Sequence, residues 1–224
     1  LKFAFDLAHS YRIQAEANPV AHIDRVLFPQ LVRSIQHLAR FVNARPENLA
    51  LVPNATTALN TIFSSVPLQA GERAIILNVG YGSVKKMLKR AANINGAIVQ
   101  EVLVTLPLLD EDSIVRAVIE TMDATESSLG RCALAVFDVI TSNTAIRMPI
   151  NRLVQVHVAG GLACLYDDTE SVTFICQEAK KRGVLSIVDG AHAPGIVPLD
   201  LQELDADFFV GNLHKHVSIG RPSH

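Results

Sequence analysis

The chain has 224 residues, of which 49% are hydrophobic and 19% charged, a composition typical of a globular protein with a sizeable core. A net charge of −2 and only short basic groups argue against nucleic-acid binding, and no apolar run is long enough to span a membrane. Three cysteines without a CxxC pair predict free thiols and a cytoplasmic location.

Residues 1–48 are expected to form an N-terminal helical segment. Between residues 17 and 43, apolar side chains recur at spacings of three and four, which is the period of a helix. Pro29 interrupts this pattern, because a proline inside a helix lacks the N–H that the helix needs. The sequence therefore predicts a kink or two helices.

From residue 49 to residue 215, strand patterns alternate with helix patterns. Strands are expected at 49–52, 74–78, 97–104, 132–139, 185–188 and 207–210, and helices at 54–65, 83–92, 113–122 and 171–182. This alternation predicts an α/β domain with a mostly parallel central sheet flanked by helices, in which ligands bind at the carboxyl ends of the strands. Residues 154–169 carry no clear period and are interpreted as an insertion.

Three short segments at expected strand ends carry chemical groups. Asn54 begins a helix with small and hydroxyl residues, whose free N–H groups could bind a phosphate, although a capped helix without a ligand is the simpler interpretation. Asp189 leaves a buried strand before a turn, so it could pair with a protonated ring nitrogen of a cofactor or cap the turn.

Lys215 closely follows the last expected strand. Apolar neighbours would remove water from its amine and favour the neutral form that Schiff-base chemistry requires. The alternative is an ordinary surface lysine with its charge in solvent. His214 and His216 flank it, but two histidines at this spacing are a weak metal signal, and no metal site is predicted.

The order of these segments resembles the class V aminotransferase family of fold-type I pyridoxal phosphate (PLP) enzymes, and within it the isopenicillin N epimerase-like branch. The supporting strings are residues 16–20, 52–58, 81–84, 189–195 and 211–215. The resemblance implies PLP as cofactor, a small amino-acid substrate, and a homodimer. It also implies a fold-type I large domain at 49–215.

Site roles follow from the resemblance, position by position. Lys215 would form the internal aldimine and then move the Cα proton, and Asp189 would keep the pyridine nitrogen protonated. The other implied contacts are Tyr81 and Ala191 on the two ring faces, Asn143 and His192 near the phenolic oxygen, and Ala55, Thr56, Thr57, Asn212 and His214 around the phosphate.

The chain departs from the family after the lysine. Residues 216–224 lack the usual aromatic residue and Pro-Lys-Gly type turn, and most of the C-terminal small domain is expected to be missing. The sequence predicts a C–S lyase or an epimerase that removes a Cα proton. An aminotransferase and a catalytically inactive PLP-fold remnant remain open alternatives.

Overall fold

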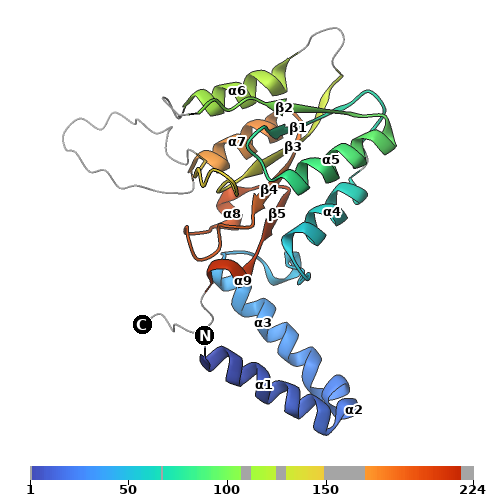
Figure 1. Cartoon of the computed structure of the whole chain (residues 1–224), viewed down its shortest axis with the longest axis vertical. Helices are drawn as coiled ribbons and strands as arrows, with labels where there is room; N and C mark the ends of the chain where they lie inside the picture. Colours follow the sequence, from blue (N-terminus) through green and yellow to red (C-terminus); the bar gives the residue numbers. More distant parts are fainter. Residues whose placement is uncertain (1, 67, 107–111, 125–129, 149–169, 218–224) are drawn as a thin grey trace, which may run out of the picture.

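A five-stranded parallel sheet forms the centre of the protein (Figure 1). The computed structural model describes residues 2–66, 68–106, 112–124, 130–148 and 170–217. The strand order is β2-β1-β3-β4-β5, with β1 Arg73–Leu77, β2 Ile98–Val102, β3 Cys132–Asp138, β4 Leu185–Gly190 and β5 Phe208–Gly211. The predicted α/β architecture is confirmed. Between β1 and β3 the direction of strand addition reverses, which in such sheets opens a crevice at the carboxyl edge.

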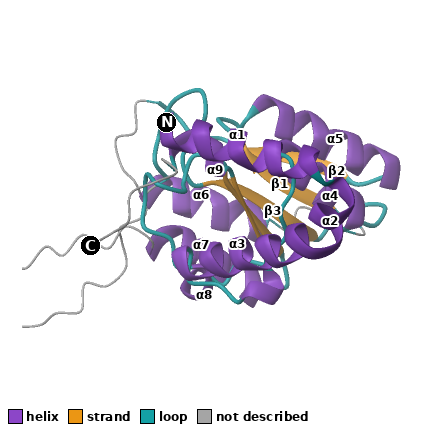
Figure 2. Ribbon diagram, turned by 90° about the horizontal axis from the view of Figure 1, so that it is seen from below, coloured by secondary structure: helices purple, strands orange, loops and turns teal. Residues whose placement is uncertain are grey.

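Helices cover both faces of this sheet (Figures 1 and 2). Helices α4 (Ala55–Ser65) and α5 (Gly82–Asn95) share one apolar core with the sheet, and α6 (Asp112–Asp123), α7 (Glu170–Lys181) and α8 (Leu201–Leu204) share the other. In β1, Ile75 and Leu77 belong to the α6 and α7 side, whereas Ala74 and Ile76 belong to the α4 and α5 side. This alternation explains why the strands are apolar throughout, because both faces are buried.

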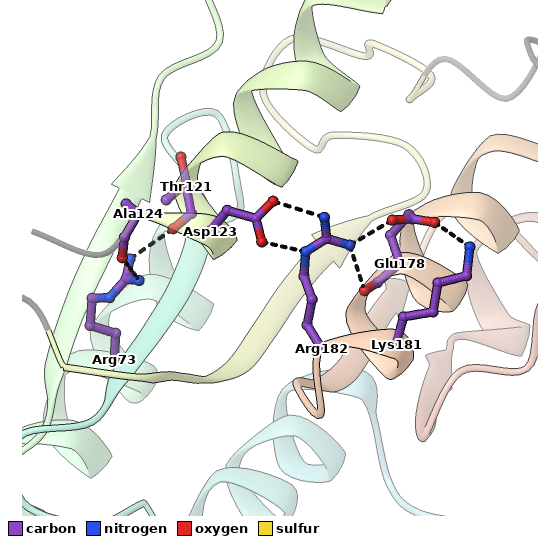
Figure 3. A network of polar contacts seen from close by, with 7 residues as sticks. All are labelled: Arg73, Thr121, Asp123, Ala124, Glu178, Lys181 and Arg182. Carbon is purple, nitrogen blue, oxygen red and sulfur yellow. Dashed lines mark hydrogen bonds and ion pairs between the residues drawn. The ribbon is translucent and has the colours of Figure 1, made fainter.

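Two arginines bind α6, one from the sheet and one from the end of α7 (Figure 3). Arg73 in β1 is 1% exposed, and its guanidinium donates to the Gln100 side chain and to the main-chain oxygens of Thr121, Ala124 and Gly130. Arg182, after α7, donates to both carboxylate oxygens of Asp123 at 2.6 and 2.8 Å and also binds Glu178. The buried guanidinium of Arg73 is tolerated because acceptors surround it.

The N-terminal residues form a helical arm beyond the sheet (Figure 1). It consists of α1 (Lys2–Ala17), α2 (Pro19–Ala21), a π-helical turn η1 (His22–Leu27) and α3 (Phe28–Phe41). The break expected near Pro29 falls where the π-helical turn η1 gives way to α3, and Pro29 lies in the first turn of α3. Phe3, Phe5 and Phe28 are 69–72% exposed, so the arm presents apolar surface.

The strand predicted at residues 49–52 is wrong. This segment follows a short 3₁₀ turn, η2 (Pro46–Asn48), and leads into the start of α4 without pairing with any strand in the described part of the chain. Leu51 and Val52 are 47% and 46% exposed. An apolar run becomes a strand only where a neighbouring strand accepts its hydrogen bonds, and this connection from the arm has no such neighbour.

After β5 the chain forms a short helix, α9 (Leu213–His216), that the sequence pattern did not predict. The insertion expected at residues 154–169 and the end of the atypical segment, 218–224, lie outside the described residues. Among the helices that are described, none combines the length and the apolar character needed to cross a membrane.

Candidate functional site

A cavity of about 290 Å³ lies at the carboxyl edge of the sheet. Its walls come from the start of α4, the start of α5, the ends of β3 and β4, and α9. Nine of the eleven predicted site residues line it: Ala55, Thr56, Tyr81, Asp189, Ala191, His192, Asn212, His214 and Lys215. Segments up to 160 residues apart in sequence therefore meet at one site, as strand-end positions in a parallel sheet require.

The first turn of α4 forms one wall. Asn54 caps the helix by accepting the Thr57 N–H at 2.8 Å, and the buried Asn212 side chain accepts the Ala55 N–H at 3.0 Å. Thr56, between them, lines the cavity. A helix N-terminus attracts anions through its N–H groups and its dipole, so this wall suits a phosphate.

Two carboxyl groups meet at the strand ends. Asp138 of β3 and Asp189 of β4 are register partners, are 4% and 5% exposed, and both line the cavity. Burial, together with the negative charge of Asp189, raises the pKa of Asp138 to about 7, although the Tyr81 N–H opposes this shift by donating to the carboxylate. Gly80 leaves room for this contact, since a Cβ there would lie 3.1 Å from Asp138 Oδ2.

Asp189 is the carboxyl group that the sequence singled out. Its Oδ1 accepts the Ala191 N–H at 3.0 Å, and burial raises its pKa above the usual value, while this hydrogen bond and the charge of Lys215 act against the shift. No cation lies within ion-pair distance of Asp189 among the described residues. A buried carboxylate facing a cavity suits a cationic group on a ligand.

Lys215 projects from α9 and contacts a histidine. Its Nζ lies 3.0 Å from His192 Nε2, and His192 Nδ1 lies 3.1 Å from His216 Nε2. The expectation that apolar neighbours strip water from Lys215 is wrong, because this residue is exposed in α9. The polar contact of Lys215 is with His192, which lies in the turn after β4.

Two predicted site residues do not line the cavity. The Thr57 N–H is used by the Asn54 cap, and Asn143 is exposed in the turn after β3. The cavity instead includes residues that the sequence analysis did not place in a site: Asn54, Leu59, Val84, Asp138, Ile140 and Ser142. A signal existed for Asp138, because a carboxylate inside the otherwise apolar run 132–139 requires a specific environment.

Comparison with known proteins supports the resemblance seen in the motifs. No family model matches the chain. Isopenicillin N epimerase of Amycolatopsis lactamdurans is 33% identical over 207 residues, which are 91% of this chain and 45% of that protein. An L-cysteine desulfhydrase of Arabidopsis thaliana is 27% identical over 176 residues, 75% of this chain and 34% of that protein. The chain is related to these two groups of proteins. Its motifs had predicted this relationship.

Solved structures show the same fold. The cystine C-S lyase C-DES, in complex with its reaction product cysteine persulfide, matches with a TM-score of 0.69 at 16% identity, over 95% of this chain and 50% of that one. The apo cysteine desulfurase of Thermococcus onnurineus NA1 matches with a TM-score of 0.61 at 18% identity, over 82% and 38%. The chain spans about 45% of the isopenicillin N epimerases that it matches.

Proposed function

We propose that this chain is the PLP-binding part of an enzyme that removes the Cα proton of an amino acid, acting as a C–S lyase or an epimerase. The observation that carries the proposal is the cavity that joins a buried carboxyl group, Asp189, to the amine of Lys215 and the first turn of α4. These are the three groups needed for a ring nitrogen, an aldehyde and a phosphate. The names of the relatives, isopenicillin N epimerase and L-cysteine desulfhydrase, supply the two reaction types.

The residues around the cavity have separate roles in this proposal. PLP, when bound, withdraws electrons from the Cα of an attached amino acid. Asp189 would keep the ring nitrogen protonated, and Lys215 would hold the cofactor and then accept the Cα proton at Nζ. Tyr81 and Ala191 would flank the ring, and His192 would lie at the phenolic oxygen. The phosphate would be held by residues from two walls of the cavity: Ala55, Thr56, Asn212 and His214.

We propose that the substrate is a small amino acid and that the full-length protein is a homodimer in the cytoplasm. Thr57 and Asn143 keep only supporting roles, because neither lines the cavity. Thr57 would act through the Asn54 cap, which fixes the first turn of α4.

Covalent trapping tests the cofactor assignment. The purified chain is incubated with PLP and reduced with borohydride, and the modified lysine is located by peptide mass spectrometry. We expect the phosphopyridoxyl group on Lys215 in the wild type and in Lys86→Ala, which removes an exposed lysine of α5, and no specific adduct in Lys215→Ala. Adducts spread over surface lysines of a folded sample would refute the assignment.

A second experiment tests the reaction. L-Cysteine and other amino acids are supplied to the PLP-loaded protein, and pyruvate, sulfide and the D-isomers are measured. Asp189→Asn should retain PLP about 10–100-fold less tightly, because it loses one charge-assisted hydrogen bond. A specific Lys215 adduct without turnover of any amino acid would support the cofactor site and identify the chain as an inactive remnant.

A further inference from the structure

Two buried carboxyl groups lie side by side at the carboxyl edge of the sheet. Asp138 ends β3, and its register partner Asp189 lies in β4, so their backbones are one strand spacing apart, roughly 4.8 Å. Two positions earlier, Val136 and Ile187 face the core shared with α4 and α5. Because side chains alternate along a strand, both carboxyl groups point to this same side, where both line the cavity.

Few groups compensate the charge of these two acids. The Tyr81 N–H donates to Asp138, and the Ala191 N–H donates to Asp189 Oδ1 at 3.0 Å. Among the residues that the structure describes, no cationic side chain lies within ion-pair distance of either carboxylate. Both residues are at most 5% exposed, so water does not screen their mutual repulsion. One of the two is therefore hard to ionise.

The other titratable groups around the cavity leave this balance in place. The α4 wall contributes none, and the rest come from the start of α5, the turn after β4, and α9: Tyr81, His192, His214 and Lys215. Lys215 Nζ contacts His192 Nε2 at 3.0 Å and makes no ion pair with a carboxylate. Burial, together with the charge of Asp189, therefore raises the pKa of Asp138 to about 7.

We propose that Asp138 and Asp189 act as one acid pair, which keeps a proton while no ligand is bound and releases it when a cationic ring nitrogen binds at Asp189. This inference rests on the proposed function, in which Asp189 meets the ring nitrogen of PLP. A positive charge at Asp189 also lies close to Asp138, because the two acids share one cavity wall, and it favours the ionised form of Asp138.

The exchange conserves charge and atoms. The O–H bond of Asp138 breaks, its electron pair stays on the carboxylate, and the proton passes to water. Before binding, the pair carries one proton and one negative charge. After binding, two carboxylates flank one cation, so the net charge at this wall is again −1. The ligand cation thus takes the place of the proton.

Proton release makes binding depend on pH. By linkage, affinity rises with pH wherever binding releases protons. Asp138→Asn cannot release a proton, although its side-chain oxygen can still accept the Tyr81 N–H. This variant should therefore lose the pH-dependent part of the affinity. A purely structural role of Asp138 would instead lower the affinity by the same factor at every pH.

Isothermal titration calorimetry measures the released protons. The probe is pyridoxine 5′-phosphate, which has the ring nitrogen and phosphate of PLP but no aldehyde and so forms no bond with Lys215. Titrations at pH 6 in two buffers of different ionisation enthalpy give the number of protons released. The titration of the probe itself cancels when variants are compared.

The wild type should release at least about half a proton more than Asp138→Asn at pH 6, where Asp138 is mostly protonated without ligand. From pH 5.5 to pH 7 the affinity of the wild type should rise at least about three-fold more than that of Asp138→Asn. Asp6→Asn, which changes an exposed carboxylate of α1, should behave as the wild type. Equal proton release and parallel affinity curves for Asp138→Asn and the wild type overturn the proposal.

A second measurement needs no variant. Carbon-13 NMR of the aspartate carboxyl carbons in the wild type should show one group that titrates near pH 7 without ligand and at lower pH with pyridoxine 5′-phosphate. A titration that is absent, or that does not move when the probe binds, would overturn the proposal and leave the proposed function intact. Failure of the wild type to bind the probe and to form the Lys215 adduct with PLP would refute the proposed function, and the acid pair's role with it.

Discussion

Replacing Asp138 by asparagine should change how the stability of the protein depends on pH. Asp138 is 4% exposed beside a second buried carboxyl group, Asp189, and its pKa is raised from 3.8 to about 7. Asparagine has nearly the same shape, carries no charge, and can still accept the Tyr81 N–H through its side-chain oxygen. The substitution therefore removes the titration and largely preserves the packing.

The sign follows from proton binding. Between pH 3.8 and pH 7 the folded protein keeps a proton on Asp138 that the unfolded chain has lost, so the stability of the wild type falls as pH rises through this window. Each pH unit costs about 1.4 kcal/mol, so three units cost about 4 kcal/mol. Below pH 3.8 both states are protonated, and above pH 7 both are ionised, so the effect is constant outside the window.

Urea unfolding followed by circular dichroism at pH 4, 5, 6, 7 and 8 measures this effect. The free energy of unfolding of Asp138→Asn minus that of the wild type should increase by about 4 kcal/mol from pH 4 to pH 8. Any pH-independent cost of burying the amide cancels in this comparison. Asp24→Asn, which removes an exposed carboxylate of η1, controls for net charge. Parallel stability curves for Asp138→Asn and the wild type would refute the reasoning.

Two further substitutions test the packing of the site and the sheet. Asn212→Ala removes the acceptor of the buried Ala55 N–H and should lower the free energy of unfolding in urea by about 1–3 kcal/mol. Asn212→Asp keeps the acceptor and should lose less stability, but its charge should weaken PLP binding; equal losses would contradict this role. Arg73→Met deprives four oxygens of their donor and should cost about 3 kcal/mol, whereas an unchanged urea midpoint would mean that the network adds no net stability.

Local sequence patterns determined most of the central fold. Strands at 74–78, 132–139 and 185–188 were predicted within two residues of β1, β3 and β4, because buried parallel strands are continuous apolar runs. The start of α4 was predicted from Asn54, whose side chain does cap the helix. Since parallel strands share one carboxyl edge, these patterns were also sufficient to bring Asp189 and Lys215 to one side of the sheet.

Other features depend on contacts between distant segments. The run 49–52 has strand-like residues, but only a neighbouring strand could have made it one. The raised pKa of Asp138 arises from burial and from Asp189, which is 51 positions away in sequence and adjacent in the sheet. The sequence shows an isolated carboxylate and cannot show that partner.

The contacts of His192 with Lys215 and His216 show the same difference between what the sequence determines and what the tertiary structure decides. The sequence by itself determined that a lysine with a histidine on either side follows the last strand, and that another histidine follows Asp189. Only the tertiary structure decided that His216, and not His214, contacts His192, because this depends on the turn of α9 and on the close approach that Gly195 permits. Residue identity fixes which groups can form a hydrogen bond, whereas distance and direction, set by the packing of two separate strand ends, decide which pair does.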